Sequence, residues 1–149
     1  DSEGPGKFRG GLGMRRDYHF PDDDATFTVL SDRDIAGPKG IFGGMAGRKA
    51  YYILNPDDPE RTKTELSSKC VIELKPGDTV SFQTPGGGGY GSPLERDPKR
   101  VLEDVILGKI NIERARECYG VIIDNRTNTV DEASTIRSRE QMIKSRSSN

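Results

Sequence analysis

The run Thr84-Pro85-Gly86-Gly87-Gly88-Gly89-Tyr90-Gly91-Ser92-Pro93 places the strongest constraint on how this chain can fold. Glycine loses more backbone freedom on folding than any other residue, so an ordered run of four glycines implies that nothing bulkier fits there. A strand-like stretch precedes the run and a capped helix follows it, which argues against an unordered linker. We therefore predict a tightly packed segment that another backbone approaches closely.

Two further glycine clusters, residues 4–13 and 37–47, accompany this run. None has a Gly-x-y period, so a collagen helix is excluded, but extended glycine and proline segments can stack as polyproline-II-like strands. We predict that the three clusters pack on each other, with Tyr90 as the anchoring side chain. The predicted structural bundle comprises Gly10, Gly11, Gly43, Gly44, Gly86, Gly87, Gly88, Gly89, Tyr90 and Gly91.

Composition and charge limit the kinds of protein that this chain can be. The 149 residues are enough for one domain with a core, but only 32% are hydrophobic, and the formal charge is −1. The low apolar content and a loop-like start at Asp1 favour a piece of a longer protein that buries surface against another chain. The charge balance favours neither nucleic acid nor an anionic membrane, and no run approaches the ~20 apolar residues of a membrane span.

Two cysteines, Cys70 and Cys118, are too few for a disulfide framework, and the N-terminus has no signal-peptide pattern. Both observations favour a reduced, cytoplasmic compartment.

Alternating apolar residues and turn signals predict a β-rich first part. The turn around Asp22–Asp24 predicts a hairpin between its flanking strands, and Pro76-Gly77 fits a type II turn that leads into a return strand. The expected strands are residues 14–20, 25–31, 50–54, 70–74 and 78–84.

The second part is predicted to be helical. Asp97 is a good N-cap with Pro98 at the first helical position, and Gly108 ends that helix. A second helix runs from Asn111 to Gly120, and Val121–Ile123 forms a short strand. The fold class is therefore mainly β with glycine-rich polyproline-II-like segments and a small α-helical C-terminal part (α+β). We expect a β-rich domain over 1–94, a helical subdomain with a terminal strand over 95–124, and a polar peripheral helix or tail over 125–149.

Catalytic patterns are scarce in this sequence. The sole histidine, His19, has no cysteine or acidic neighbours at zinc-ligand spacing, and no Gly-x-Ser-x-Gly elbow occurs. The segment Gly44–Lys49 comes closest to a phosphate-binding P-loop and fails on spacing. We therefore assign no catalytic residue and no metal ligand to this chain.

Three cationic residues, Arg9, Arg33 and Lys69, lie beside glycine segments or strand ends. Each could clamp a substrate carboxylate or a neighbouring chain, or could form a local ion pair. The residues alone leave these alternatives open.

Five motifs occur in a fixed order: Gly4–Gly13, Leu30–Arg33, Gly43–Gly47, Ser68–Asp78 and Thr84–Gly91. Together they resemble the C-terminal part of the hydantoinase B / 5-oxoprolinase family. The stretch 97–124, with Tyr119-Gly120-Val121, is similar to the N-methylhydantoinase branch. The resemblance covers residues 1 to about 124.

This resemblance implies the B component of an ATP-dependent enzyme that opens a cyclic amide such as a hydantoin, a lactam or oxoproline. An ATPase A component would phosphorylate an oxygen of the substrate or intermediate, which creates a leaving group on an unreactive amide. The implied partners are the remaining N-terminal part of the B component and the A component, in a hetero-oligomer. ATP and a divalent metal are expected elsewhere in that complex, with no cofactor bound by this chain, which alone would be catalytically incomplete.

Two alternatives stay open. One is a component of an ATP-dependent ketone carboxylase of the same family. The other is a non-catalytic structural or interaction module that reuses the fold.

Overall fold

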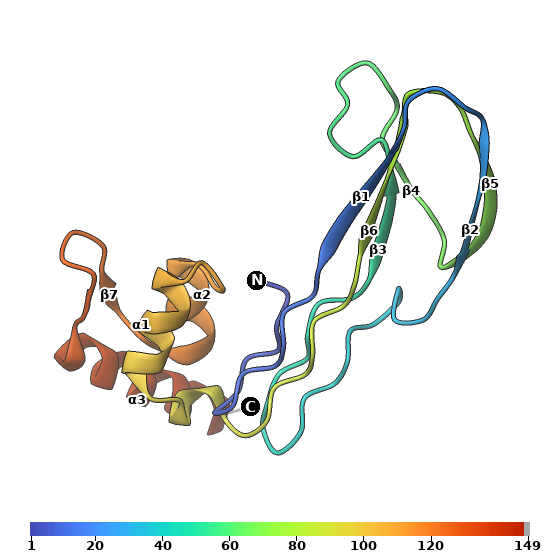
Figure 1. Ribbon diagram of the computed structural model, residues 1–149. Coiled ribbons are helices and arrows are strands. Elements are labelled where there is room, and N and C mark those ends of the chain that lie inside the picture. The colour runs from blue at the N-terminus through green and yellow to red at the C-terminus, as the bar shows by residue number, and fades with distance from the viewer. Residues whose placement is uncertain (148–149) are drawn as a thin grey trace.

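The computed structural model describes residues 1–147 and has a β-rich part, a set of extended glycine segments and a helical part (Figure 1). This arrangement confirms the predicted α+β class. Ser148 and Asn149, the end of the polar tail, lie outside the described residues. The elements are β1 (Arg15–Phe20), β2 (Ala25–Leu30), β3 (Tyr51–Leu54), β4 (Thr64–Glu65), β5 (Lys69–Leu74), β6 (Asp78–Gln83), η1 (Pro93–Glu95), α1 (Pro98–Ile106), α2 (Ile112–Tyr119), β7 (Ile123–Asp124), β8 (Thr129–Val130) and α3 (Glu132–Ser147).

Strands β1, β2, β5 and β6 form a bent two-stranded antiparallel ribbon. β1 pairs antiparallel with β6, from Arg15 opposite Gln83 onwards, and β2 pairs antiparallel with β5, ending with Leu30 opposite Lys69. At the turns that follow β1 and β5 the ribbon bends over, so that β2 and β5 lie across from β1 and β6 (Figure 1). β3 extends the sheet on the free side of β6, and β4 adds a short edge, giving the order β1-β6-β3-β4.

The predicted hairpin of residues 14–31 is therefore wrong, and the strand 78–84 does not pair back on 70–74. The turn residues do mark turns, but a turn specifies only that the chain changes direction. Each strand pairs with a strand about forty to seventy positions away in the sequence, through contacts that a local pattern does not contain.

The turn at Pro76-Gly77 has the expected geometry. Gly77 has φ 85°, and the amide of Asp78 donates to the carbonyl of Lys75 at 2.9 Å. The buried Asp78 carboxylate accepts from the Lys75 amide at 2.7 Å, from Asn55 at 2.9 Å and from Arg61 at 2.7 Å. Burial by itself would raise the pKa of Asp78, but these donors outweigh it, and the pKa lies below its usual value.

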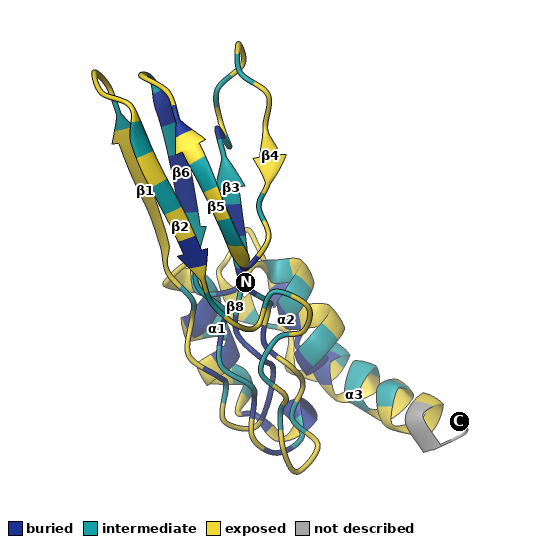
Figure 2. Ribbon diagram, turned by 90° about the vertical axis from the view of Figure 1, so that its right-hand side faces the viewer, coloured by how far each residue is buried: buried dark blue, intermediate teal, exposed yellow. Residues whose placement is uncertain are grey.

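A small core holds the bent ribbon together. Val29 of β2 packs with Ala50 and Tyr52 at the start of β3, and partly buried Phe27, Leu66, Cys70 and Phe82 surround them. The rings of Tyr52 and Phe82 meet edge-on, with centroids 5.0 Å apart. Burial is concentrated in β6, and in β3 only Tyr52 is buried, whereas β1 is largely exposed (Figure 2).

The helical part follows the predicted caps. The Asp97 carboxylate accepts from the Lys99 amide at 2.9 Å, the Asn111 side chain accepts from the Arg114 amide at 2.7 Å, and Gly120 ends α2 with φ 64°. Its core contains Val101, Ile110, Ala115, Tyr119, Val121 and Ile123.

The last helix, α3, packs against this core with little apolar contact. Ile136 and Ile143 are exposed, and Arg139 holds the helix by donating to the carbonyls of Tyr119 at 3.0 Å and Arg96 at 2.7 Å.

We predict that Asp78→Asn lowers the free energy of unfolding at pH 7 by about 1.5–3 kcal/mol, because charge-assisted hydrogen bonds to a buried carboxylate are lost. The folded-state pKa of Asp78 is depressed, so its stabilising effect is present above the unfolded-state pKa and is lost as the pH falls through the folded-state pKa. Urea unfolding between pH 7 and pH 3 should show the gap between wild type and variant closing at the acid end. The control Asp24→Asn removes an exposed carboxylate paired with Lys75 and should have little effect. A gap that is the same at both pH values would contradict the assignment.

Candidate functional site in the glycine-rich bundle

The third glycine segment, residues 86–91, lies between the first (4–13) and the second (37–47). The Gly4 amide donates to the Gly87 carbonyl at 2.7 Å, and the Gly87 amide donates to the Gly11 carbonyl at 2.9 Å. On the other side, the Gly89 amide donates to the Met45 carbonyl at 2.9 Å. The first and second segments also meet directly, through a 2.7 Å bond from the Met45 amide to the Pro5 carbonyl. The structure thus brings all three segments into one bundle.

Side chains are sterically excluded from most of this bundle. A Cβ atom added to Gly88 would lie under 3.0 Å from the Lys39 carbonyl, a contact that real Cβ atoms essentially never make. The same holds, against the backbone of another bundle segment or its flanking residues, at Gly4, Gly6, Gly10, Gly13, Gly44, Gly47, Gly86 and Gly89. Glycine is required at these positions because backbone meets backbone.

Four residues of the predicted bundle have other roles. Gly43 and Gly91 have positive φ angles of 87° and 70° and belong to turns. A Cβ on Gly11 would face open space, and Gly11 contributes to the bundle through its carbonyl. Gly87 is an intermediate case, because a Cβ there would lie 3.0 Å from the Gly11 amide nitrogen. The Tyr90 ring lies at the surface, 47% exposed, whereas its backbone exchanges hydrogen bonds with Phe8 in the middle of the bundle.

The bundle amides are largely occupied by carbonyls of the bundle itself. Gly4, Gly44, Gly87 and Gly89 all donate within it, which leaves them no hydrogen for a bound phosphate. A phosphate cradle instead requires successive free N–H groups that point at the anion. These amides are therefore not available to bind a phosphate.

A buried ion-pair network ties the bundle to the helices. Asp104 of α1, whose side chain is only 4% exposed, accepts from Arg9 at 3.1 Å and from Arg96 at 2.7 Å. Arg96 also donates to the carbonyl of Lys7 at 3.1 Å. Arg9, which the sequence analysis considered for substrate or interface binding, belongs to the first glycine segment and forms an ion pair with Asp104 of α1.

A second connection joins the N-terminal segment to α2. The buried Glu3 carboxylate accepts from Arg114 Nε at 2.6 Å, and the Glu3 carbonyl accepts from Arg114 Nη2 at 2.7 Å. Burial and the nearby Glu3 carboxylate raise the pKa of the Tyr119 hydroxyl above its usual value. Both connections hold the helical part in a fixed position on the bundle.

Arg33 and Lys69 flank the end of the β2–β5 pair at which Leu30 lies opposite Lys69, and neither is part of the Arg9–Asp104 network. Both residues are exposed, and Lys69 begins β5 whereas Arg33 lies in the loop after β2, where the Ser31 amide donates to the Ser68 carbonyl at 2.9 Å. Arg33 adopts a positive φ of 69°, and its carbonyl accepts from the Ala50 amide at 2.8 Å. The neighbouring Asp34 has a lowered pKa, chiefly because Ser68 hydrogen-bonds to its carboxylate.

Metal-binding and membrane-spanning features are not found in the described part of the chain. Residues 1–147 contain no group of three or more His, Cys, Asp and Glu side chains arranged to hold a metal ion. His19 is exposed and pairs with Thr79 across β1 and β6 at 2.9 Å. Within the same range, no helix has the length and apolar character needed to cross a bilayer.

Sequence reasoning missed an exposed aromatic cluster at the turn of the second glycine segment. Phe8, Phe42 and Tyr90 gather there, with the Phe42 and Tyr90 ring centroids 5.2 Å apart and those of Phe8 and Tyr90 6.0 Å apart. Ile41 joins them through its bridge to Tyr90. The three aromatic residues belong to three different glycine segments, so they become neighbours only when the bundle folds.

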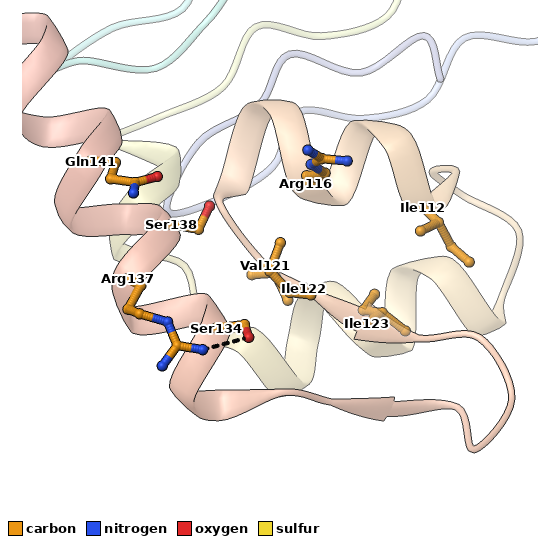
Figure 3. Close-up of a pocket in the computed structure, with 9 residues that line it drawn as sticks. All are labelled: Ile112, Arg116, Val121, Ile122, Ile123, Ser134, Arg137, Ser138 and Gln141. Atoms are coloured by element: carbon orange, nitrogen blue, oxygen red, sulfur yellow. Dashed lines mark hydrogen bonds between the residues drawn. The ribbon is translucent and has the colours of Figure 1, made fainter.

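A groove of about 480 Å³ lies between α2, α3 and the segment 121–123 (Figure 3). Its floor is apolar, and Arg116 and Arg137 lie at its sides; Arg137 donates to Ser134 at 2.9 Å. The lining residues include no carboxylate, histidine or cysteine, so the groove has no general base or metal ligand. They are Ile112, Arg116, Val121, Ile122, Ile123, Ser134, Arg137, Ser138 and Gln141.

This geometry agrees with comparisons to known proteins. A family model described as hydantoinase B/oxoprolinase matches residues 1–93, and the chain belongs to this family. Its relatives include the B component of a putative D-/L-hydantoinase from Pseudomonas sp. (strain NS671), which is 38% identical over 120 residues, covering 80% of this chain and 20% of that protein.

Two solved structures share the fold across almost the whole chain. An ATP-dependent caprolactamase from Pseudomonas jessenii has a TM-score of 0.74 and 33% identity over 94% of this chain and 24% of its own. A nucleotide-free acetone carboxylase has a TM-score of 0.81 and 25% identity over 99% of this chain and 24% of its own. The chain therefore spans about a fifth to a quarter of the length of these three relatives.

We expect replacements in the bundle to follow backbone proximity. Gly88→Ala should cost at least about 2 kcal/mol of unfolding free energy, because its methyl group overlaps the Lys39 carbonyl. Gly11→Ala should change stability by less than about 1 kcal/mol, because nothing lies within 4 Å, and Gly87→Ala should fall between them. Thermal and urea unfolding of the three variants provides the measurement. Equal losses at Gly11 and Gly88 would contradict the packing described here.

Removing the charge of Asp104 should uncouple the bundle from the helices. Asp104→Asn leaves Arg9 and Arg96 without their carboxylate in a buried site, and we expect a loss of about 3–5 kcal/mol. Glu95→Gln, which breaks the exposed pair with Lys7, should cost less than about 1 kcal/mol. Urea unfolding compares the two variants, and similar small losses in both would show that the network does not bind the two parts together.

Proposed function

We propose that this chain is part of the B component of an ATP-dependent amidohydrolase that opens a cyclic amide, and that it contributes the glycine bundle and an interface to the other components. The observation that carries the proposal is the similarity to the caprolactamase structure, which extends over bundle and helices together at 33% identity. Family membership and the identity to a hydantoinase B component support it further.

The described residues fit a supporting role in such an enzyme. The bundle amides bond to carbonyls of the bundle, and the residues that line the groove beside α3 include no carboxylate, histidine or cysteine. We propose that ATP, a divalent metal and the hydrolytic groups belong to the remainder of a family-length B component and to an ATPase component. This chain would hold those parts in position, within a hetero-oligomer.

A ketone carboxylase component is the second candidate, and the TM-score of 0.81 to acetone carboxylase favours it. The two activities have a common logic, because ATP activates an oxygen of a poorly reactive compound by phosphorylation. They differ in the compound consumed, since a carboxylase requires bicarbonate and a hydrolase requires water.

The test uses the complete complex of this chain with the remainder of the B component and the ATPase component. ATP hydrolysis is measured with hydantoin, 5-oxoproline or caprolactam, and separately with acetone or acetophenone in the presence and absence of bicarbonate. The proposal predicts stimulation by a cyclic amide without bicarbonate, whereas a bicarbonate requirement assigns the chain to the carboxylase alternative. Gly11→Ala should retain the activity and Gly88→Ala should lose it together with assembly. A chain that forms a stable monomer, binds neither component and supports no turnover would contradict both candidates.

A further inference from the structure

Three buried side-chain atoms at the joint between the N-terminal segment and the helices have no hydrogen-bond partner within residues 1–147. They are Oε2 of Glu3, Nε of Arg96 and the hydroxyl oxygen of Tyr119, and this range contains no other buried side-chain atom of that kind. Glu3 and Tyr119 are fully buried, and the Arg96 side chain is 9% exposed. A buried donor or acceptor without a partner loses its hydration and gains nothing in return, so three at one joint require an explanation.

The remaining polar atoms of the two charged side chains are held by direct bonds. The other oxygen of Glu3 accepts from Arg114 Nε at 2.6 Å. Arg96 donates through Nη2 to Asp104 at 2.7 Å and through Nη1 to the carbonyl of Lys7 at 3.1 Å. Neither side chain can turn its unpaired atom toward another protein group without breaking these bonds.

The three residues are neighbours in the fold. Arg139 of α3 donates to the backbone carbonyls of Tyr119 at 3.0 Å and Arg96 at 2.7 Å, so both residues adjoin one guanidinium group. Glu3 is held by Arg114, which lies on α2 together with Tyr119. Burial raises the pKa of the Tyr119 hydroxyl most, the charge of Glu3 raises it further, and the charge of Arg96 lowers it. Both charges therefore act on the hydroxyl, although neither side chain bonds to it.

The unpaired atoms have complementary hydrogen-bonding roles. The Nε–H of Arg96 only donates, an ionised Glu3 oxygen only accepts, and the Tyr119 hydroxyl can do either. An anion would suit Arg96 but would be repelled by Glu3, and a cation would be attracted by Glu3 but repelled by Arg96. A small neutral molecule that both donates and accepts satisfies all three atoms. Water has this property, and a buried water typically makes about three hydrogen bonds to polar groups that would otherwise be unpaired.

We propose that this joint binds one internal water molecule, which accepts from Arg96 Nε and from the Tyr119 hydroxyl and donates to Glu3 Oε2. The water connects the N-terminal segment, the end of η1 and the end of α2. It also joins the Arg96–Asp104 pair to the Glu3–Arg114 pair, so the two connections between bundle and helices form one hydrogen-bonded network. The site is independent of the proposed function, because it is built entirely from residues of this chain.

A crystal structure of the full chain at a resolution that shows ordered waters tests the site directly. The expected result is one water oxygen within about 3.2 Å of Glu3 Oε2, Arg96 Nε and the Tyr119 hydroxyl. Crystals soaked in bromide and in rubidium should show no anomalous peak there. A direct bond between Tyr119 and Glu3 with no water between them would overturn the proposal, and so would a bromide or rubidium ion at the site.

Water–protein NOE and ROE measurements test the same site in solution. In wild type, the Arg96 Nε–H should show a water NOE and a water ROE of opposite sign, which distinguishes a bound water from proton exchange. Tyr119→Phe leaves the water two of its three partners, so both signals should persist while the Tm falls by about 2–4 °C. The matched control Tyr52→Phe removes a buried hydroxyl that bonds directly to Ser31, and it should leave the signals unchanged. If wild type and Tyr52→Phe both lack the signals, the joint holds no long-lived water and the proposal is wrong.

Discussion

The close approach of the third glycine segment to the other two is the contact on which the rest of this structure depends. It is made by peptide groups alone, since at Gly88 and Gly89 even a methyl group would collide with a carbonyl. Such contacts bury little apolar surface, so their stability comes from hydrogen bonds that are lost together if one segment is displaced. The glycines therefore contribute by having no side chain, which allows neighbouring backbones to approach closely enough to form these hydrogen bonds.

The two flanking parts depend on this bundle for their relative positions. The ribbon continues directly from it, through Met14 on one side and Thr84 on the other, where the Thr84 amide bonds to the Met14 carbonyl at 2.9 Å. The helices are attached through charges, at Asp104 and Glu3, both almost fully buried. Buried ion pairs stabilise weakly when compared with apolar packing, but they allow few alternative arrangements, which suits a joint whose geometry matters.

Local sequence signals predict the helix ends and turns of this fold, but they do not predict which strands pair. Asp97, Asn111 and Gly120 fix helix ends through their own side chains or backbone, so the sequence alone predicts them. The turn at Pro76-Gly77 was also predictable, but the partners of its flanking strands were not, because pairing depends on residues far away. The aromatic cluster at Phe42 was missed for the same reason. The positive φ of Phe42 is likewise a property of the folded chain, which composition and periodicity do not predict.

The position of Tyr90 has a consequence for how the protein reaches its native state. Its backbone bonds to Phe8, near the N-terminus, and its neighbours Gly89 and Gly91 bond to Ile41. The bundle therefore closes only after most of the β-rich part has been synthesised. Contacts between distant positions form slowly because the chain must first lose the entropy of a large loop. Until then, three flexible segments display unpaired amides and carbonyls that any extended strand could capture. The same lack of side chains that makes the native bundle compact thus leaves the nascent chain open to wrong pairing, and a partner protein that meets the bundle early would shorten that interval.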